Sequence, residues 1–457
     1  MQPESIGWGL LAALCLTGGA LAAGPDVTLL DIQSTSNYGA VMVAGLGSVR
    51  GYALGSHTCN MGSTNLIWAN NGTPALAMNA YRLHNGRLMQ IGLANCKTAC
   101  CAAAGSGCGS SCNGQGGSVL GAGCLDVYGS GFNGGQTRLA PRSVINGYSG
   151  TIGAYPGTTG DAIFRRLQIK QADLTAANFP GALYFVEGVY VATDDAAGGA
   201  WLNNATYKRV TVDASFNLNL TGAAYTQIPA IRAWRDHGLG ANTADPSVNI
   251  GQVTIPGEGT FWWASKVRNL GNGRWMYDYA VFNLNSDRSG GSFVVPVAPG
   301  VTVSNIGSNQ PFYHSGEPVN YSDTWTATRT ANSVTFATPQ TFQQNANSSA
   351  LRWGTMYNFW FEADVPPTAG AAVTLNTFKP GASVVPAIPA GAPSVPPCNP
   401  DLNGDGNVDQ DDVNYLVNVV GGGANPSGIN PDFNNDGNAD QDDVSSLINR
   451  VAGGACP

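Results

Sequence analysis

Apolar and polar residues alternate in short runs along most of the chain, and residues that favour turns separate these runs. Such runs cover residues 162–170, 182–191, 207–220, 259–267, 274–284, 292–297 and 357–365. A two-residue period places successive side chains on opposite faces of a strand. Asn85-Gly86 and Gly271-Asn272-Gly273 lie between strand-like arms and indicate hairpins. The pattern therefore predicts a mainly β body.

This body runs from residue 24 to residue 378, which is too long for one β-sandwich, since sandwich domains have about 100 residues. We predict two β-sandwich-like domains, at 24–248 and 249–378. A stretch with seven prolines between Pro380 and Pro400 follows. Because proline favours extended backbone, we predict a semi-rigid Pro-rich linker at 379–397, before a tail at 398–457.

A period of 3.6 residues, typical of a helix, appears only in the tail. Apolar residues fall at i, i+3, i+4 and i+7 in two sets, which are Val413, Leu416, Val417 and Val420, and then Val444, Leu447, Ile448 and Val451. We therefore predict a small α-helical tail in which one helix follows each of two acidic loops.

The acidic loops belong to an internal repeat. Residues 400–420 and 431–451 are identical at 14 of 21 positions, and each copy contains Asp-x-Asn-x-Asp-Gly-x-x-Asp-x-x-Asp. This is the spacing of a twelve-residue Ca²⁺ loop, in which hard oxygen ligands converge on one point. The predicted ligands of two Ca²⁺ sites are Asp401, Asn403, Asp405, Asn407, Asp409 and Asp412, and then Asp432, Asn434, Asp436, Asn438, Asp440 and Asp443.

No helix is predicted before either loop, and the twelfth position is Asp where an EF-hand has Glu. With these features, residues 398–457 resemble a type I dockerin, and more closely the GC-type dockerin-like tails that end secreted bacterial proteins in Gly and Cys. The resemblance implies a cohesin-like partner on a scaffold or cell envelope, recognised through Gln410, Asp411, Gln441 and Asp442. It also implies two equivalent, rotated binding modes. The alternative is calcium that serves folding alone.

Ten cysteines are present, and Cys398 and Cys456 flank the repeat. A disulfide between them would close a loop of about sixty residues and stabilise a tail with few apolar residues. Six more cysteines lie in a Cys-rich loop at 96–124, where the spacing is poor for zinc and disulfides are the better interpretation. Adjacent Cys100 and Cys101 are not expected to pair with each other.

Residues 1–23 have the pattern of a secretory signal peptide. An apolar run leads to Ala20 and Ala22, small residues that favour cleavage after Ala22 or Ala23, although no Lys or Arg precedes the run. The alternative is an ordinary apolar strand. No later run approaches the about 18 apolar residues of a membrane span. We therefore expect a secreted protein, associated with the cell surface.

Charge is scarce and unevenly placed. Charged residues make up 11% of the chain, against about 25% in typical soluble domains, and the net charge is −8. The tail from Cys398 onward has ten Asp and one Arg, a balance of −9, whereas residues 24–397 have a balance of +2 and Glu4 adds −1. This balance excludes a strongly basic nucleic-acid-binding protein.

Catalytic candidates in the body are few. Glu187 lies among aromatic residues, where burial could raise its pKa, and Glu317 lies close to His314. Either could serve as an acid in glycoside hydrolysis, and the alternative for each is a structural carboxylate. Aromatic rows would stack on sugar rings if exposed and form core if buried. The rows contain Trp262, Trp263, Trp275, Tyr277, Tyr279, Tyr357, Phe359 and Phe361.

Sequence phrases at 279–289, 292–296, 314–318 and 351–359 resemble a recurrent, uncharacterised family of secreted bacterial proteins. The resemblance spans about residues 250–380, and it implies export and a β-rich fold but no known activity. We expect the body to be a structural or ligand-binding module. The alternative is a polysaccharide-degrading enzyme that is displayed through the same tail.

Overall fold

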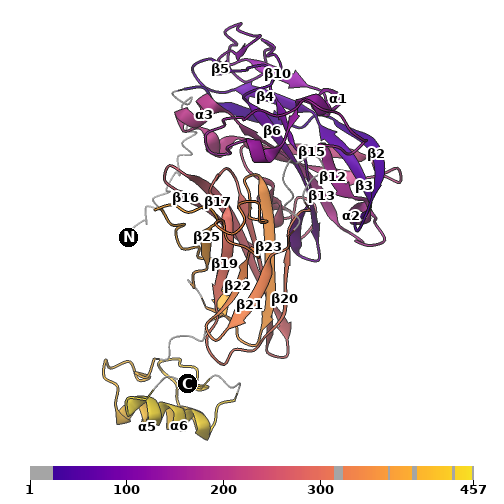
Figure 1. Ribbon diagram of the computed structural model, residues 1–457. Coiled ribbons are helices and arrows are strands. Elements are labelled where there is room, and N and C mark those ends of the chain that lie inside the picture. The colour runs from indigo at the N-terminus through magenta and orange to yellow at the C-terminus, as the bar shows by residue number, and fades with distance from the viewer. Residues whose placement is uncertain (1–23, 313–322, 369–370, 394–398, 435–437, 455–457) are drawn as a thin grey trace, which may run out of the picture.

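The computed structural model consists of two stacked blocks of β-structure and a small tail with two helices (Figure 1). It describes residues 24–312, 323–368, 371–393, 399–434 and 438–454, so the predicted signal peptide lies outside the described residues. Strands dominate both blocks, which confirms the prediction of a mainly β body. Among the residues described, no helix combines the length and the apolar character needed to cross a membrane.

The N-terminal block is built on a ten-stranded antiparallel sheet with the order β15-β14-β13-β6-β7-β12-β3-β2, in which β8 pairs with β6 and β11. The strands are β2 (Thr35–Val43), β3 (Gly47–Leu54), β6 (Ala75–His84), β7 (Arg87–Leu93), β8 (Cys96–Thr98), β11 (Leu139–Ala140), β12 (Leu167–Lys170), β13 (Leu183–Val191), β14 (Ala205–Val212) and β15 (Leu218–Tyr225).

Two smaller sheets and several short helices complete this block. The sheets contain β1 (Val27–Asp31), β4 (Ser56–Asn60) and β10 (Leu125–Tyr128), and β5 (Leu66–Ile67) with β9 (Val119–Leu120). The helices are α1 (Ser130–Asn133), α2 (Gln171–Leu174), α3 (Thr193–Gly198) and α4 (Ala233–Asp236), with 3₁₀ turns η1 (Gln136–Arg138), η2 (Arg142–Val144), η3 (Trp201–Asn203) and η4 (Ala230–Arg232).

The large sheet is strongly curved, so that its edge strands β2 and β15 approach each other. The Thr35 hydroxyl donates to the Leu218 carbonyl at 2.5 Å, and the Asn37 amide donates to Asn217 at 3.1 Å. Register shifts between β2 and β3, between β6 and β7, and between β14 and β15 mark bulges, which bend and twist strands. The prediction of a simple sandwich is therefore wrong for this block: the sheet curls like a half-barrel around its core, and the small β1-β4-β10 sheet packs against it.

The C-terminal block is a sandwich of a five-stranded and a four-stranded sheet, with orders β16-β17-β18-β23-β20 and β21-β22-β19-β25. The first contains β16 (Asn249–Ile255), β17 (Gly259–Gly271), β18 (Arg274–Asn283), β20 (Val303–Asn309) and β23 (Thr355–Ala363), and the second β19 (Gly290–Pro296), β21 (Thr326–Thr330), β22 (Ser333–Ala337) and β25 (Thr374–Thr377). Phe359 of one sheet stacks on Phe293 of the other with ring centroids 4.7 Å apart.

Most of the Pro-rich segment belongs to the sandwich. Its residue Ile388 exchanges two backbone hydrogen bonds with Val373, at 2.8 and 3.0 Å. Strand β26 (Ala392–Pro393) pairs with β24 (Pro367–Thr368), and the side chain of Ile388 is fully buried. The prediction of a semi-rigid linker that separates body and tail is therefore wrong for 379–393, because isolated apolar residues between the prolines pack into the sandwich core.

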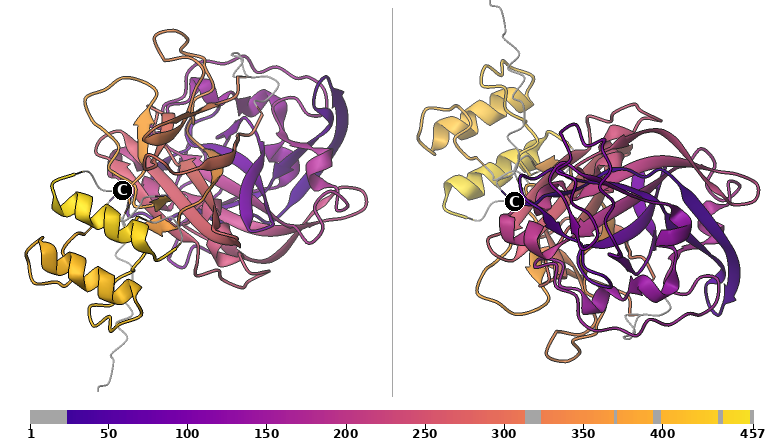
Figure 2. Two further views of the ribbon diagram at one scale, coloured as in Figure 1. Left: turned by 90° about the horizontal axis from the view of Figure 1, so that it is seen from below. Right: turned by 90° about the horizontal axis from the view of Figure 1, so that it is seen from above.

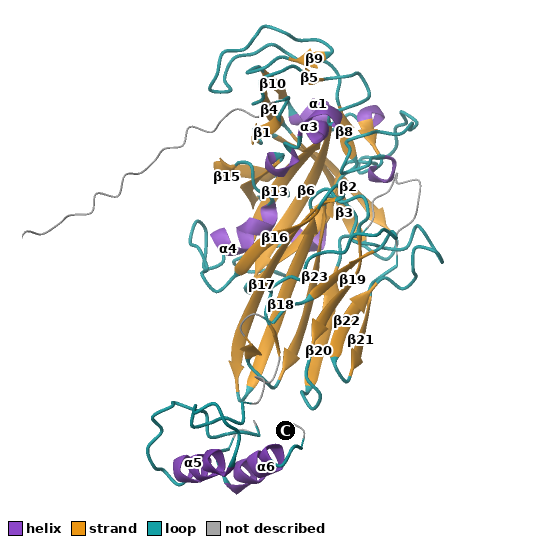
Figure 3. Ribbon diagram, turned by 90° about the vertical axis from the view of Figure 1, so that its left-hand side faces the viewer, coloured by secondary structure: helices purple, strands orange, loops and turns teal. Residues whose placement is uncertain are grey.

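The two blocks share one hydrophobic cluster. It joins Tyr81 and Phe185 of the large sheet to Phe282, Trp353 and Met356 of the sandwich. The strands of the sandwich run up to this contact, as the side view shows (Figure 3). Because these side chains are buried together, the blocks form a single packed body and not two modules on a flexible joint.

The tail holds α5 (Gln410–Val420) and α6 (Gln441–Val451), which lie side by side (Figure 2). These elements confirm the predicted helix after each acidic loop. Val413, Leu416, Val444 and Leu447 are buried as expected, but Val417 and Ile448 are 50% and 49% exposed. The predicted apolar stripe is thus too wide at its edge, because a helix pair covers only the centre of each stripe.

Candidate functional site

The first acidic loop curls around the carboxylate of Asp401. The N–H groups of Gly404 and Asp405 donate to its Oδ1 at 2.8 and 3.1 Å, and that of Gly406 donates to Oδ2 at 3.0 Å. Gly404 and Gly406 have φ angles of +76° and +90°, which glycine adopts without a Cβ clash. Positions four to six therefore bend back toward position one, as they must if loop oxygens are to converge.

The third, fifth and seventh positions lie along the same turn. Asn403 donates through Nδ2 to Oδ2 of Asp405 at 3.2 Å, and the N–H of Asn407 donates to Oδ1 of Asp405 at 2.8 Å. That backbone hydrogen bond holds the pKa of Asp405 below its usual value. Asp405 is thus ionised at neutral pH, as a carboxylate ligand of a cation must be.

The twelfth residue ties the first loop to α5. Asp412 is fully buried, and its Oδ1 accepts hydrogen bonds from the N–H groups of Leu402 and Asn403 at 2.6 and 3.1 Å. Its Oδ2 accepts from the N–H of Asp409 at 3.0 Å, while Asp409 accepts from the N–H of Asp411 at 2.9 Å. This reciprocal capping box fixes where the helix starts.

The second loop has the same arrangement in its described part. Asp443 is fully buried and accepts from the N–H groups of Asn434 and Asp440, both at 2.8 Å. Asp440 and Asp443 form the equivalent capping box at the start of α6. Asp432, Asn434 and Asn438 are among the described residues, whereas Asp436 lies outside them.

The tail carries much charge and little core. Its buried apolar side chains are Leu402, Val413, Leu416, Phe433, Val444 and Leu447. The sequence of the tail contains ten Asp residues against these few apolar side chains. Over the ranges that the structure describes, no three Asp, Glu, His or Cys side chains already converge as a closed metal site. The first loop thus has the backbone shape for a cation, while its carboxylates stand apart.

The residues of the predicted partner surface are all exposed. Gln410 and Asp411 occupy the first turn of α5, and Gln441 and Asp442 occupy the first turn of α6. Val417 and Ile448 lie seven residues beyond the two glutamines, hence on the same helix faces. Sequence periodicity assigned both aliphatic side chains to the core and thus missed them as surface residues.

Glu187 is sealed inside the body. Its Oε2 accepts hydrogen bonds from Asn79 and Tyr81 at 2.7 and 2.6 Å, and its Oε1 accepts from the N–H of Ala230 at 2.6 Å. Burial raises the pKa of Glu187, and these three hydrogen bonds, followed by the charge of Arg142, oppose that rise. A fully buried, fully bonded carboxylate fits a structural role and gives a substrate no access. Glu317 lies outside the described residues.

Arg142 is the centre of the polar network around Glu187. It donates to the carbonyls of Ala94 and Gly354, both at 2.7 Å, to the Met78 carbonyl at 3.1 Å and to Oδ1 of Asn79 at 2.8 Å. Gly354 belongs to the sandwich and the other partners to the N-terminal block. Sequence reasoning missed Arg142, because no local pattern marks a residue whose partners lie up to 212 positions away.

The same network continues through glutamine and asparagine side chains. Gln90 accepts from the N–H of Met356 at 2.7 Å and donates to Asn79 at 3.0 Å. Asn358 donates to the Leu88 carbonyl at 2.8 Å. These bonds connect β7 to β23, so the contact between the blocks has a polar seam within its apolar cluster.

The aromatic rows are mostly core. Tyr277, Tyr279, Tyr357, Phe359 and Phe361 are at most 1% exposed. Trp263 is 8% exposed, while Trp262 and Trp275 are partly buried against the clusters. These rings stabilise the sandwich and leave little surface for stacking on a sugar.

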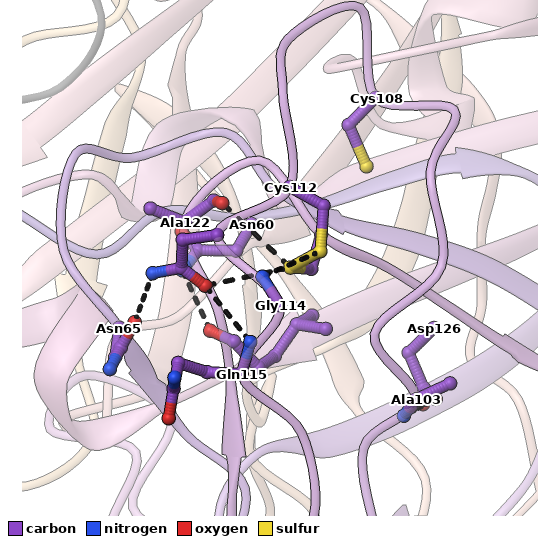
Figure 4. The surroundings of a disulfide bond; sticks show 12 residues. Asn60, Asn65, Ala103, Cys108, Cys112, Gly114, Gln115, Ala122 and Asp126 are labelled. Carbon is purple, nitrogen blue, oxygen red and sulfur yellow. Dashed lines mark hydrogen bonds between the residues drawn. A yellow bond between two sulfur atoms is a disulfide. The ribbon is translucent and has the colours of Figure 1, made fainter.

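Disulfides occur in the Cys-rich loop, as predicted. Cys112 pairs with Cys124, and Cys108 pairs with Cys59 of β4, outside the loop. Figure 4 shows the surroundings of Cys112, with Gly114 and Gln115 close by. The Asn113 amide donates to Asn65 at 2.7 Å and further fastens the loop. Cys398 and Cys456, the predicted tail disulfide, lie outside the described residues.

Asp195 is a second buried carboxyl that the sequence did not single out. It accepts from the N–H of Val27 at 3.0 Å and from the Asn204 amide at 2.8 Å. Burial, reinforced by Asp26 and Asp194, raises the pKa of Asp195 from 3.8 to about 7. The folded protein therefore binds this proton more tightly than the unfolded chain does.

This pKa predicts that Asp195 lowers the stability of the body as pH rises from about 4 to 7, by at most about 1.4 kcal/mol per pH unit. Asp195→Asn should remove that contribution, since Asn204 can rotate its amide to accept from the new NH₂ group. Urea unfolding at about pH 5 and about pH 7 measures both slopes. Identical slopes for the two proteins would contradict the assignment.

Comparisons with known proteins add no relatives. No protein-family model matches the chain, and no curated protein matches it significantly.

Proposed function

We propose that this protein is exported and that a calcium-dependent, dockerin-like tail holds its β-rich body at a cell surface or in an extracellular assembly. The observation that carries the proposal is the first acidic loop, in which three backbone N–H groups fold back onto Asp401. Every position of the motif is repeated 31 residues later, with the same capping box. A twelve-residue spacing of oxygen ligands that occurs twice in this way supports a cation site in each copy.

Calcium would be held by side-chain oxygens of Asp401, Asn403, Asp405 and Asp412, by the Asn407 carbonyl and by Asp409, with the corresponding residues in the second loop. Two Ca²⁺ ions offset four of the tail's nine net negative charges. They also supply folding free energy that six buried apolar side chains do not supply alone. The cation thus serves the fold of the tail first.

The exposed faces of α5 and α6 support a protein partner. Gln410 and Val417 on α5, and Gln441 and Ile448 on α6, present the same polar and aliphatic chemistry twice. Exposed aliphatic side chains rimmed by polar groups are typical of binding surfaces. A cohesin-like or cell-envelope protein fits this chemistry, and either helix could present it.

For the body, the burial of Glu187 and of the aromatic rows favours a structural or ligand-binding module. The enzyme alternative, a dockerin-borne glycoside hydrolase that acts on polysaccharide, rests on Glu317 and finds no support in the described residues.

The partner is tested by passing envelope extract of the parent cell over the immobilised full chain. We expect one cell-surface protein to be retained in calcium and released by EDTA. The variant Val417→Asp with Ile448→Asp should keep its calcium and lose the partner. If the retained protein is unaffected by EDTA and by the double variant, or if no protein is retained, the remaining role of calcium is in folding only.

A further inference from the structure

Cys100 and Cys101 are neighbours in the sequence, and their Sγ atoms lie 2.8 Å apart at the surface of the Cys-rich loop. Cys101 is exposed and Cys100 is partly exposed. Non-bonded carbon atoms, which are smaller than sulfur, already prefer separations of about 3.5–4.0 Å. Both cysteines are unbonded in the structure, as the sequence predicts, yet their sulfurs are closer than two independent thiols remain.

We propose that Cys100 and Cys101 form a vicinal disulfide that opens and closes reversibly, which makes this point of the Cys-rich loop a redox-responsive site. The inference does not depend on the proposed function of the tail. It concerns a different part of the molecule, on the N-terminal block.

Adjacency makes such a bridge easy to reduce. Neighbouring Cα atoms are about 3.8 Å apart, whereas most disulfides span about 4.4–6.8 Å, so a vicinal bridge is strained. Strained and exposed disulfides have higher reduction potentials than buried structural ones. The disulfide between Cys108 of this loop and Cys59 of β4, whose Cα atoms are 5.7 Å apart and whose side chains are buried, provides the structural contrast.

The surroundings provide charges that act on the thiols. The contact with Cys100 raises the pKa of Cys101, burial and Asp126 add to the rise, and Arg138 opposes it. Burial lowers the pKa of Lys97 to about 8, and its ammonium group lies 4.8 Å from the ring centroid of Tyr128. Cys101 is thus mainly a protonated thiol, and the nearby Arg138 partly offsets the groups that keep it so.

Closure needs an oxidant, for which we name a low-molecular-weight disulfide. The thiolate of one cysteine attacks a sulfur of that disulfide, and one small thiolate leaves. The thiol of the other cysteine then attacks the first cysteine's sulfur and expels the second small thiol. The pair loses two electrons and two protons in all, and the small disulfide gains them. Excess small thiol reverses both steps.

The backbone of the pair is tied to the core of the block. The N–H of Cys101 donates to the Tyr128 hydroxyl at 3.2 Å, and that hydroxyl donates to the Cys101 carbonyl at 2.5 Å. The Trp68 indole also donates to the Tyr128 hydroxyl, at 3.0 Å. Forming or breaking the Cys100–Cys101 disulfide therefore acts on a segment of the loop whose backbone is held by Tyr128.

The test equilibrates the full chain with mixtures of oxidised and reduced glutathione, blocks free thiols with iodoacetamide and maps peptides by mass spectrometry. At the oxidising end, the peptide with Cys100 and Cys101 should carry no label and lack two hydrogens. It should gain two labels at a glutathione ratio at least about tenfold more oxidising than the ratios that open Cys59–Cys108 and Cys112–Cys124.

Two variants complete the test. In Cys100→Ser, Cys101 should take the label in reduced glutathione and carry a mixed disulfide with glutathione in oxidised glutathione, and its peptide should never show the loss of two hydrogens. Cys112→Ser with Cys124→Ser should leave the midpoint of the vicinal pair unchanged. Labelling of both Cys100 and Cys101 in fully oxidised glutathione would overturn the proposal. A bridge from either residue to another cysteine, or opening only together with the structural disulfides, would do the same.

Discussion

Removing calcium from the full chain is expected to unfold the tail and leave the β body intact. The tail has six buried apolar side chains and ten carboxylates, so without a cation its charges repel one another with little core to resist them. Each bound ion should stabilise the folded tail by about 2.7 kcal/mol at a free calcium concentration 100 times its dissociation constant.

Circular dichroism at the helical minimum measures this loss, because α5 and α6 are the longest helices described. Isothermal titration should count two ions for the native chain and none for Asp401→Ala combined with Asp432→Ala. The matched control is Asp411→Ala with Asp442→Ala, which removes two exposed carboxylates outside the ligand set and should still bind two ions. Helices that persist in EDTA would contradict the expectation.

Replacing Arg142 by methionine is expected to destabilise the body by about 3–5 kcal/mol, because it removes four buried hydrogen bonds, to the carbonyls of Met78, Ala94 and Gly354 and to Oδ1 of Asn79. It also removes a positive charge that acts on Glu187. Urea unfolding followed by tryptophan fluorescence gives the change in the free energy of unfolding. Exposed Arg235, replaced in the same way, should change it by less than about 0.5 kcal/mol.

The double variant Arg142→Met with Glu187→Leu makes the prediction sharper. If Arg142 and Glu187 belong to one hydrogen-bond network through Asn79, the double variant should lose less stability than the two single variants added together. Simple additivity would show that the two groups act independently, and the assigned network would then be wrong.

Local patterns predicted the elements better than their assembly. Alternation located strands such as β13 and β18, and the Asn85-Gly86 pair marked the hairpin between β6 and β7, because these signals lie within a few residues. The helices of the tail followed from a 3.6-residue period and from the repeated loops. In each case the information is carried by neighbours in the chain.

What the sequence did not predict depends on distant contacts. The curl of the large sheet arises from bulges that carry no distinct local signal, and Ile388 joins the sandwich from within a proline-rich stretch that reads as a spacer. Arg142 and Asp195 acquire their roles from partners 48 to 212 and 9 to 168 positions away. At the candidate metal loops the situation is reversed, since every ligand lies within twelve residues.

The polar seam between the blocks has a mechanical consequence. Arg142, Gln90 and Asn358 bridge the two blocks by directional bonds set within a shared apolar cluster, so relative sliding would have to break them together. A load applied to the sandwich is thus passed on to the large sheet without a hinge to absorb it. Under tension the two blocks of the body should therefore move as one rigid unit.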